Sequence, residues 1–206
     1  MLTHDLGTYL GYLGSALGVA MVVPQILRTL RHRQMAGVSA LSWSLTVTSC
    51  TLWMLYGFRA HETVQIPGNI LLVSGAIVVV LLVPARLPVA ARACALAVVL
   101  AMLFLLATQL PPRLIGVVAT AIGVSSTLPQ VIKSVRRPAD APSAVAIPTW
   151  VMRVFSQGSW IGFAVLCHDP VVLASAVFTE TCNVTVLTAE LRRVRALHST
   201  PALVAA

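Results

Sequence analysis

Apolar residues fill seven stretches of the chain, and short segments rich in Pro, Gly, His and Arg separate them. Each stretch is about 20 residues long or more, which is the length that an α-helix needs to cross the hydrocarbon core of a bilayer. The stretches cover residues 6–30, 38–58, 64–84, 89–109, 112–134, 144–167 and 170–191. This pattern predicts an all-α protein of seven transmembrane helices, with no room for a separate soluble domain.

The composition agrees with a membrane protein. Of 206 residues, 58% are hydrophobic and only 10% are charged, whereas about 25% of the residues of a soluble domain are charged. The net charge of +8 could suggest a nucleic-acid partner, but such a partner requires a basic face on a soluble fold. Here the basic residues lie between apolar stretches, so we predict a lipid bilayer and no nucleic acid as partner.

The basic residues also predict the orientation in the membrane. Alternate loops hold four basic clusters, and the remaining loops hold Arg59 and Arg113. The clusters are Arg28, Arg31 and Arg33; Arg86 and Arg92; Lys133, Arg136 and Arg137; and Arg192, Arg193 and Arg195. Because Lys and Arg favour cytoplasmic loops, we expect a multi-pass protein of the plasma membrane with its N-terminus outside and its C-terminus in the cytoplasm.

The second half of the sequence repeats the first. Residues 23–28 (Val-Pro-Gln-Ile-Leu-Arg) recur as residues 128–133 (Leu-Pro-Gln-Val-Ile-Lys), at an offset of 105. At an offset of 107, four residues of the first half align with four of the second: Trp43, Trp53, Tyr56 and His61 with Trp150, Trp160, Phe163 and His168. The repeated unit is three helices, and an intervening fourth helix makes the two copies parallel. We expect repeats at 1–84 and 111–206 and a linker helix at 85–110.

These motifs resemble the PQ-loop family, and within it the SWEET and SemiSWEET sugar transporters. The resemblance covers nearly the whole chain and rests on five motifs: Pro24-Gln25, Pro129-Gln130, Gly37-Val38-Ser39, Trp53-Met54-Leu55-Tyr56-Gly57 and Pro67-Gly68-Asn69. It implies a 3+1+3 arrangement in which two three-helix bundles rock around a central cavity. It also implies that Pro24, Gln25, Pro129 and Gln130 act as hinges, which suits the kink that proline introduces into a helix. A static kink that aids packing is the alternative.

The resemblance also implies a sugar site. In this family a tryptophan on the second helix and an asparagine on the third helix of a triplet contact the sugar, and Trp53 and Asn69 match them. Trp160 matches in the second triplet, where Ala176 aligns with Asn69. The other two tryptophans, Trp43 and Trp150, lie near the predicted cytoplasmic ends of their helices and are interpreted as interfacial anchors.

Polar residues inside the last two apolar stretches extend this predicted site. Arg153, Gln157 and Trp160 share one helix face at spacings i, i+4 and i+7, and Glu180 and Asn183 share a face with Ala176. Helical geometry places Arg153 and Glu180 at depths at which they could meet. Three roles stay open for such a pair: a structural ion pair, a solute-binding pair, or a proton carrier at Glu180.

The sequence therefore predicts a transporter of a small polar solute. A mono- or disaccharide moved by facilitated alternating access is the leading hypothesis. A proton-coupled transporter of an amino acid or charged metabolite, using Glu180 and Arg153, is the first alternative, and a non-transporting receptor is the second. No catalytic grouping, metal-ligand cluster or cofactor motif occurs, so we expect neither an enzyme nor a metal or cofactor. A homo-oligomer is compatible with the sequence but not required.

Overall fold

The computed structural model describes residues 2–32, 40–83, 86–138 and 146–199. Within these ranges the chain forms seven α-helices and no strand. The helices are α1 (Leu2–His32), α2 (Ala40–Ala60), α3 (Gln65–Leu82), α4 (Val89–Gln109), α5 (Pro112–Arg136), α6 (Ile147–Leu166) and α7 (Pro170–Ser199). Each coincides with one of the seven predicted apolar stretches, so the predicted all-α fold class is confirmed.

The predicted helix ends are least accurate at the polar end of α7. This helix continues to Ser199, eight residues beyond the predicted end at residue 191. Backbone hydrogen bonds carry a helix past the end of its apolar stretch, and Arg192, Arg193 and Arg195 extend α7 in this way.

Five of the helices are long and apolar enough to cross a membrane: α1, α3, α4, α5 and α7. The remaining two, α2 and α6, are interrupted by polar residues, among them Ser49, Thr51, Arg153 and Gln157. Polar side chains within a helical bundle usually face its interior or a water-filled cavity. The protein is therefore an integral, multi-pass membrane protein in which α2 and α6 have the most polar interior faces.

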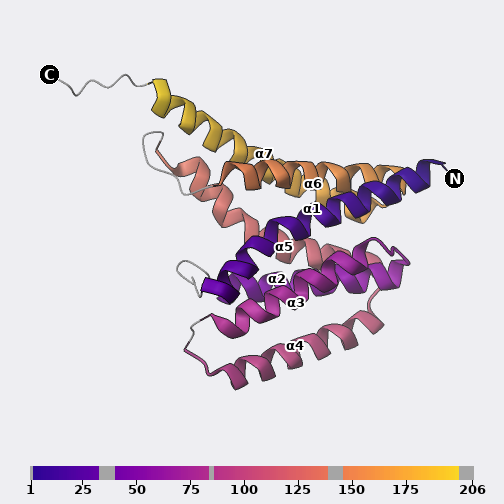
Figure 1. Cartoon of the computed structure of the whole chain (residues 1–206). Coiled ribbons are helices and arrows are strands. Elements are labelled where there is room, and N and C mark those ends of the chain that lie inside the picture. Colours follow the sequence, from indigo (N-terminus) through magenta and orange to yellow (C-terminus); the bar gives the residue numbers. More distant parts are fainter. Residues whose placement is uncertain (1, 33–39, 84–85, 139–145, 200–206) are drawn as a thin grey trace.

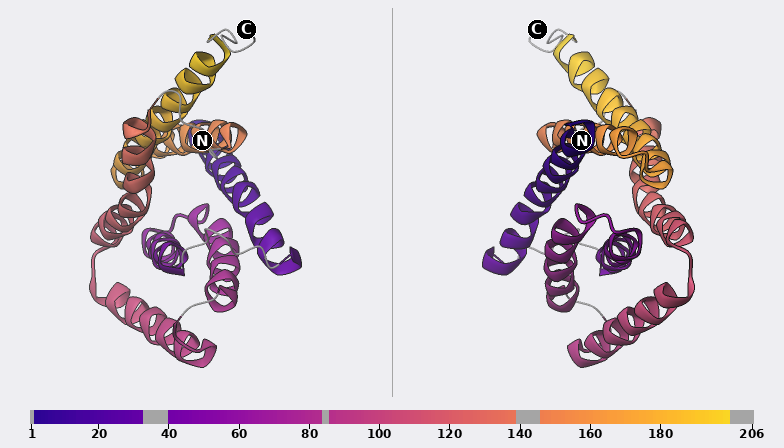
Figure 2. Two further views of the ribbon diagram at one scale, coloured as in Figure 1. Left: turned by 90° about the vertical axis from the view of Figure 1, so that its left-hand side faces the viewer. Right: turned by 90° about the vertical axis from the view of Figure 1, so that its right-hand side faces the viewer.

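The helices pack in the same order in both halves of the chain. In the first half α3 packs against both α1 and α2, and in the second half α7 packs against both α5 and α6. The halves meet through two further pairs, α1 with α6 and α2 with α5, while α4 lies outside against α2 and α3 (Figures 1 and 2). We call α1–α3 the first triplet and α5–α7 the second triplet.

The two ends of the bundle differ in charge. All seven helices run between the same two ends, shown left and right in Figure 1. One end carries Lys133, Arg136, Arg137 and the arginines of α7, and we call it the basic end. The other, which we call the opposite end, carries the N-terminus of α1 and the α2–α3 and α6–α7 connections, with Glu62 and Asp169.

The buried apolar core lies at the opposite end and joins both triplets. It is formed by Leu52, Leu55, Tyr56, Val64, Ala107, Ile115, Ala119, Phe163, Ala164 and Val172. These residues come from the later turns of α2, α4 and α6, from the earlier turns of α5 and α7 and, in the case of Val64, from the α2–α3 connection. Burial of apolar surface therefore closes the bundle at this end.

The helices α2 and α6 end in the same way. The residues that follow them, His61 and His168, have left-handed backbones with φ of 60° and 58°. In each case the next amide bonds back to the carbonyl five residues earlier, from Glu62 to Gly57 at 2.8 Å and from Asp169 to Ala164 at 2.9 Å. This is the Schellman type of helix end. The aligned histidines thus share a structural role as helix stops.

Close packing of α1 on α6 depends on glycines of α1. A Cβ atom added to Gly14 would lie 3.0 Å from both the Ser156 carbonyl oxygen and the Trp160 ring, and one added to Gly11 would lie 3.0 Å from Phe163. The Ser156 hydroxyl donates a hydrogen bond of 2.8 Å to the Gly14 carbonyl across the same interface. Small residues let membrane helices approach closely in this manner.

Enlarging Gly14 should therefore separate the two triplets. We expect Gly14→Leu to destabilise the protein by about 1–3 kcal/mol, because the Ser156 backbone cannot move without shifting α6. Gly158→Leu is the matched control, since a Cβ there has no neighbour within 4 Å. Unfolding of both variants in the same detergent checks this, and equal stability would show that the α1–α6 interface adapts to larger residues.

Candidate functional site

A cavity of about 300 Å³ lies between the two triplets, and we call it the central cavity. Every helix except α4 contributes to its lining. Five of the seven predicted site residues line it: Trp53, Asn69, Arg153, Gln157 and Trp160. The other lining residues are Gly14, Ser15, Gly18, Ser49, Cys50, Gln65, Gly68, Leu72, Ala119, Thr120, Gly123, Val124, Thr127, Val172, Ser175, Ala176 and Thr179.

Packing fixes the two tryptophan rings of the central cavity. Trp53 meets Tyr56 edge to face, with ring centroids 5.5 Å apart, and Trp160 meets Phe163 in the same way at 5.6 Å. These pairs occupy aligned positions in the two triplets. Both tryptophans also pack against the apolar core. Each ring is therefore fixed in position and presents one surface to the cavity.

The amide of Asn69 is held by its own helix. Its Nδ2 donates a hydrogen bond of 2.6 Å to the Gln65 carbonyl, one turn earlier on α3. This bond orients the side chain, and Asn69 lines the cavity with the neighbouring residues Gln65 and Gly68. The site thus combines two aromatic surfaces with the amides of Asn69 and Gln157, the groups that a hydroxylated ring would contact.

A second cavity of about 480 Å³ lies toward the basic end, and we call it the vestibule. Trp43 and Trp150 line it, so the prediction that these two residues act as interfacial anchors in the lipid is wrong. Their helices begin at the basic end but turn these rings inward. The vestibule and the central cavity share Thr127 and Arg153, so the path from the basic end to the central cavity passes Arg153.

The predicted meeting of Arg153 and Glu180 does not occur. The Arg153 guanidinium lies over the Trp150 ring, 5.1 Å from its centroid, and its Nε is buried without a hydrogen-bond partner. Glu180 lines neither cavity. The face of α7 that lines the cavity carries Val172, Ser175, Ala176 and Thr179. Glu180 lies about 100° around the helix from Thr179, to one side of this face.

Asn183 is likewise placed outside both cavities, although it was predicted to bind the solute. It is buried on α7, one turn beyond Glu180. One oxygen of Glu180 and the side-chain oxygen of Asn183 are buried without a hydrogen-bond partner. These two residues thus form a polar site within the second triplet that is separate from the central cavity.

The structure describes the side chains of two of the four predicted hinge residues and only the backbone of the other two. Pro129 lies inside α5, and Gln130 lines the vestibule and donates a hydrogen bond of 3.1 Å from Nε2 to the Ser134 hydroxyl. Pro24 and Gln25 lie on the helical backbone of α1, but their side chains are outside the described part. The Gly37-Val38-Ser39 motif is outside it altogether. Hinge motion at these residues stays a prediction.

A hydrogen bond joins the triplets at the opposite end, and the sequence did not reveal it. The Tyr56 hydroxyl of α2 donates to Asp169 Oδ2 at 2.7 Å, and both residues are buried. The other carboxylate oxygen of Asp169 accepts the amides of Val171 and Val172 at 3.0 and 2.9 Å. The available signal was Asp169 directly before Pro170, which is a typical start of a helix.

Glu62 of the α2–α3 connection lies near this closure. Burial raises the pKa of Glu62 above its usual value, the Asp169 carboxylate raises it further, and His4 opposes the rise. The same two acids, with burial, raise the pKa of the neighbouring Cys167 thiol. The Asp169 carboxylate thus opposes ionisation of Glu62, its repeat-related counterpart, at the closed end.

This arrangement predicts that the protein is more stable in acid. A carboxyl whose pKa is raised by folding contributes stability below its unfolded pKa and loses it as the pH rises through the folded value. We expect stability to fall as the pH rises from about 4.5. Glu62→Gln should flatten this pH dependence of stability. Asp5→Asn, at an exposed acid of α1, should leave the pH dependence unchanged. Thermal unfolding in detergent from pH 4.5 to 8 measures it, and an unchanged profile in Glu62→Gln would contradict it.

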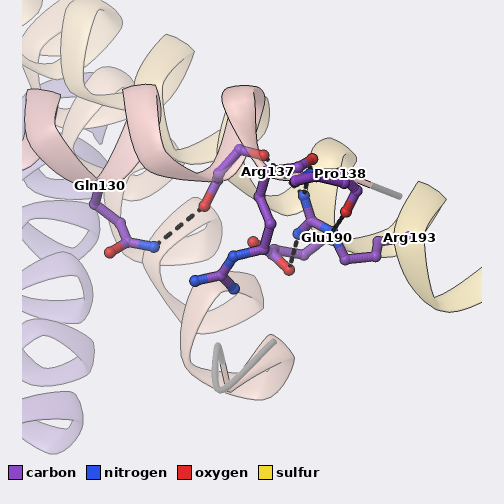
Figure 3. A network of polar contacts seen from close by, with 6 residues as sticks. Gln130, Arg137, Pro138, Glu190 and Arg193 are labelled. Carbon is purple, nitrogen blue, oxygen red and sulfur yellow. Dashed lines mark hydrogen bonds and ion pairs between the residues drawn. The ribbon is translucent and has the colours of Figure 1, made fainter. Parts of the chain in front are cut away.

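At the basic end an arginine of α7 holds the end of α5 (Figure 3). Arg193 forms a buried ion pair with Glu190 at 2.6 Å. Its guanidinium also donates to the carbonyls of Ser134, Arg137 and Pro138 at 2.9, 3.1 and 3.1 Å. These are the last carbonyls of α5, which its own helix cannot satisfy. We call this group the Arg193 clasp.

The described part of the chain contains no group of three or more His, Cys, Asp or Glu side chains placed to hold a metal ion. The central cavity instead offers stacking surfaces, amides, hydroxyls and one guanidinium.

Comparison with known proteins agrees with this architecture. No curated protein sequence matches the chain, but residues 6–66 match the PQ loop repeat family. Among solved structures, the fold is similar to that of a eukaryotic SWEET transporter. The TM-score is 0.79 at 13% sequence identity, over 95% of this chain and 100% of that chain. At such low identity the likeness shows the fold, the 3+1+3 arrangement of seven helices. Residues 6–66 thus resemble a PQ loop repeat, and the whole chain has a fold similar to that of the SWEET transporter.

Proposed function

We propose that this protein moves a small polar solute across a membrane by facilitated alternating access, without ATP. The observation that carries the proposal is a solute-sized cavity between two triplets that the described residues close at the opposite end. At the opposite end the apolar core and the Tyr56–Asp169 bond close the bundle. Toward the basic end the central cavity continues into the vestibule. The similar solved structure is that of a transporter.

The proposed motion exchanges one closure for another. Closing the basic end requires the vestibule to collapse, while opening the opposite end requires the Tyr56–Asp169 bond to break. The triplets meet through α1–α6 and α2–α5, so rocking of one triplet on the other would alternate the two states. Residues 1–84 and 111–206 would form the moving units, with 85–110 as linker. Pro24, Gln25, Pro129 and Gln130 would be the hinges.

We assign the solute to the sugars. Trp53 and Trp160 provide flat apolar surfaces, and Asn69 and Gln157 provide amides that exchange hydrogen bonds with hydroxyl groups. Proton-coupled transport through Glu180 has less support, because Glu180 lines neither cavity. A receptor with the same fold would bind the solute without moving it, and the flux experiment below separates the two.

The basic end would face the cytoplasm. Lys133, Arg136, Arg137, Arg192 and Arg195 gather there, and positive residues are retained on the cytoplasmic side during insertion. The N-terminus of α1 would then lie outside and the C-terminus inside, in the plasma membrane.

Counterflow in proteoliposomes tests the proposal. Vesicles are loaded with unlabelled solute, and entry of the labelled form is followed for monosaccharides, disaccharides, sugar acids and neutral amino acids. We expect exchange of a sugar-type solute at symmetric pH, without a proton gradient. Asn69→Ala should lower exchange at least about tenfold, since each lost amide contact of about 1.4 kcal/mol costs that factor. Ser159→Ala, whose hydroxyl bonds only within α6, should exchange normally. Solute binding without any flux would favour a receptor.

A further inference from the structure

Among the described residues, one cation and no anion line the path of the solute. Among the described residues around the central cavity and the vestibule, Arg153 is the single charged side chain. It forms no ion pair with a described carboxylate. Its contacts are the Trp150 ring and the cavity itself, and its Nε is buried without a hydrogen-bond partner. A charge inside a membrane is costly without a counter-ion and marks a substrate pathway by default. An anion in the cavity would supply that counter-ion.

Arg153 also stands where a solute must pass. It lines both cavities, at their junction. Gln157 and Trp160 follow it along α6 on the same face, one and two turns further into the central cavity. A molecule with its acidic group at Arg153 would thus place the rest of its structure against Gln157 and Trp160.

The internal repeat does not require an arginine at this position, because the aligned residue of the first triplet is neutral. Thr46 aligns with Arg153 at the offset of 107 and lines the vestibule from the first triplet. Its hydroxyl donates to the Ser42 carbonyl at 3.1 Å, within its own helix. A neutral residue therefore suffices for the helical framework at this position. The positive charge is a property of the solute path rather than of the repeated scaffold.

The remainder of the central cavity suits a single hydroxylated ring. Trp53 and Trp160 offer stacking surfaces, and Asn69 and Gln157 offer hydrogen bonds. The volume of about 300 Å³ is at the small end of the range of about 300–1,000 Å³ for ligand pockets. The planar guanidinium can bind a carboxylate through two parallel hydrogen bonds.

We propose that the solute is a single-ring sugar acid, a uronate, whose carboxylate binds Arg153 while its hydroxyl groups contact Asn69 and Gln157. This inference rests on the proposed function and specifies its substrate class. The described lining contains no carboxylate that could carry a proton with the solute. Each solute therefore transfers one negative charge, and its flux follows the membrane potential.

Glucuronate, galacturonate and glucose are the probes, because glucuronate differs from glucose only in the carboxylate at C6 and galacturonate is a second ring-forming acid. Binding to the detergent-solubilised protein and counterflow in proteoliposomes are measured in parallel for the full chain and for Arg153→Gln and Arg153→Lys. Arg195→Gln, at an exposed arginine of α7 outside both cavities, is the matched control. Flux is also measured under imposed potentials of both signs.

We expect the sugar acids to bind and exchange at least about tenfold better than glucose. Arg153→Gln should reduce this preference to near one, Arg153→Lys should keep part of it, and Arg195→Gln should keep all of it. A vesicle interior that is positive should accelerate uptake of the acids. Glucose exchange that equals or exceeds that of the acids, or a preference unchanged in Arg153→Gln, would overturn the substrate class and leave transport standing.

Two further outcomes separate this inference from the proposed function. Binding of the acids that Arg153→Gln abolishes, without flux in the unmodified protein, would support the substrate class and contradict transport. Neither binding nor flux for any of the three probes, in a protein that unfolds cooperatively, would contradict both.

Discussion

Replacing Arg193 by methionine is expected to lower the free energy of unfolding by about 3–5 kcal/mol, because it removes one partner of the buried ion pair between Arg193 and Glu190. The same change removes the donors to three carbonyls at the end of α5. Both Arg193 and Glu190 are less than 5% exposed, so water cannot replace the lost interactions. Chemical unfolding in detergent micelles, followed by helical circular dichroism, measures the change.

The chain offers a matched control for this experiment. Arg192 precedes Arg193 on the same helix but is exposed, so Arg192→Met should change stability by no more than about 0.5 kcal/mol. Combining Glu190→Gln with Arg193→Met should recover part of the loss, since no buried charge remains. Equal stability of Arg192→Met and Arg193→Met would mean that the Arg193 clasp does not hold α5 to α7.

Tyr56→Phe is expected to shift the protein toward a state that is open at the opposite end. The hydrogen bond from Tyr56 to Asp169 links the triplets and involves a buried carboxylate, and such bonds are worth about 1.5–3 kcal/mol. If the bond is made only in the closed state, its loss raises the open population about 10- to 150-fold relative to the closed one. Asp169 keeps its two backbone donors on α7, so the helix start is retained.

Distances between spin labels across the opposite end measure this shift. Labels at Thr63 of the first triplet and Val165 of the second are both exposed, and the four native cysteines are replaced beforehand. We expect a longer distance component in Tyr56→Phe. The control is Tyr9→Phe, at an exposed tyrosine of α1, which should leave the distribution unchanged. Identical distributions in the two variants would show that this bond does not hold the closed state.

The helices and the polar residues of the cavity could be predicted from sequence because each rests on local information. An apolar stretch of about 20 residues is sufficient to define a membrane helix, and all seven were found. Trp53 and Asn69 came from a resemblance, while Arg153 and Gln157 stood out as polar residues within apolar stretches. The structure brings these four residues together around one cavity.

The residues that the structure places outside the cavity, or that the sequence did not indicate, depend on helix rotation and on where the cavity ends. Glu180 lies to one side of the α7 face that lines the cavity, and Asn183 lies one turn beyond Thr179, the last α7 residue of the lining. Trp43 and Trp150 have the position of anchors along their helices, yet their rings face the vestibule. Depth follows from counting residues, whereas rotation depends on how α5, α6 and α7 pack, and no single helix encodes that.

The closures at the two ends illustrate the same limit. Tyr56 and Asp169 are 113 residues apart in sequence and meet only because α2 and α7 approach at the opposite end. In the sequence, Arg193 is one member of a basic cluster, and nothing in the cluster distinguishes it from the neighbouring Arg192. Burial of Arg193 against the end of α5 distinguishes the two arginines, and it depends on contacts 55–59 residues away.

By itself, the sequence determined that this is a seven-helix membrane protein built from a repeated three-helix unit, because hydrophobic length, helix-breaking residues and repeated motifs are properties of the chain alone. The tertiary structure decided which polar residues share a cavity, which end is closed, and that Arg153 faces the solute path without an acidic partner in the described part of the chain. The physical reason is that transfer into the bilayer depends on the composition of each helix. Pairing of buried charges and hydrogen bonds depends instead on the rotation and contact of helices far apart in sequence.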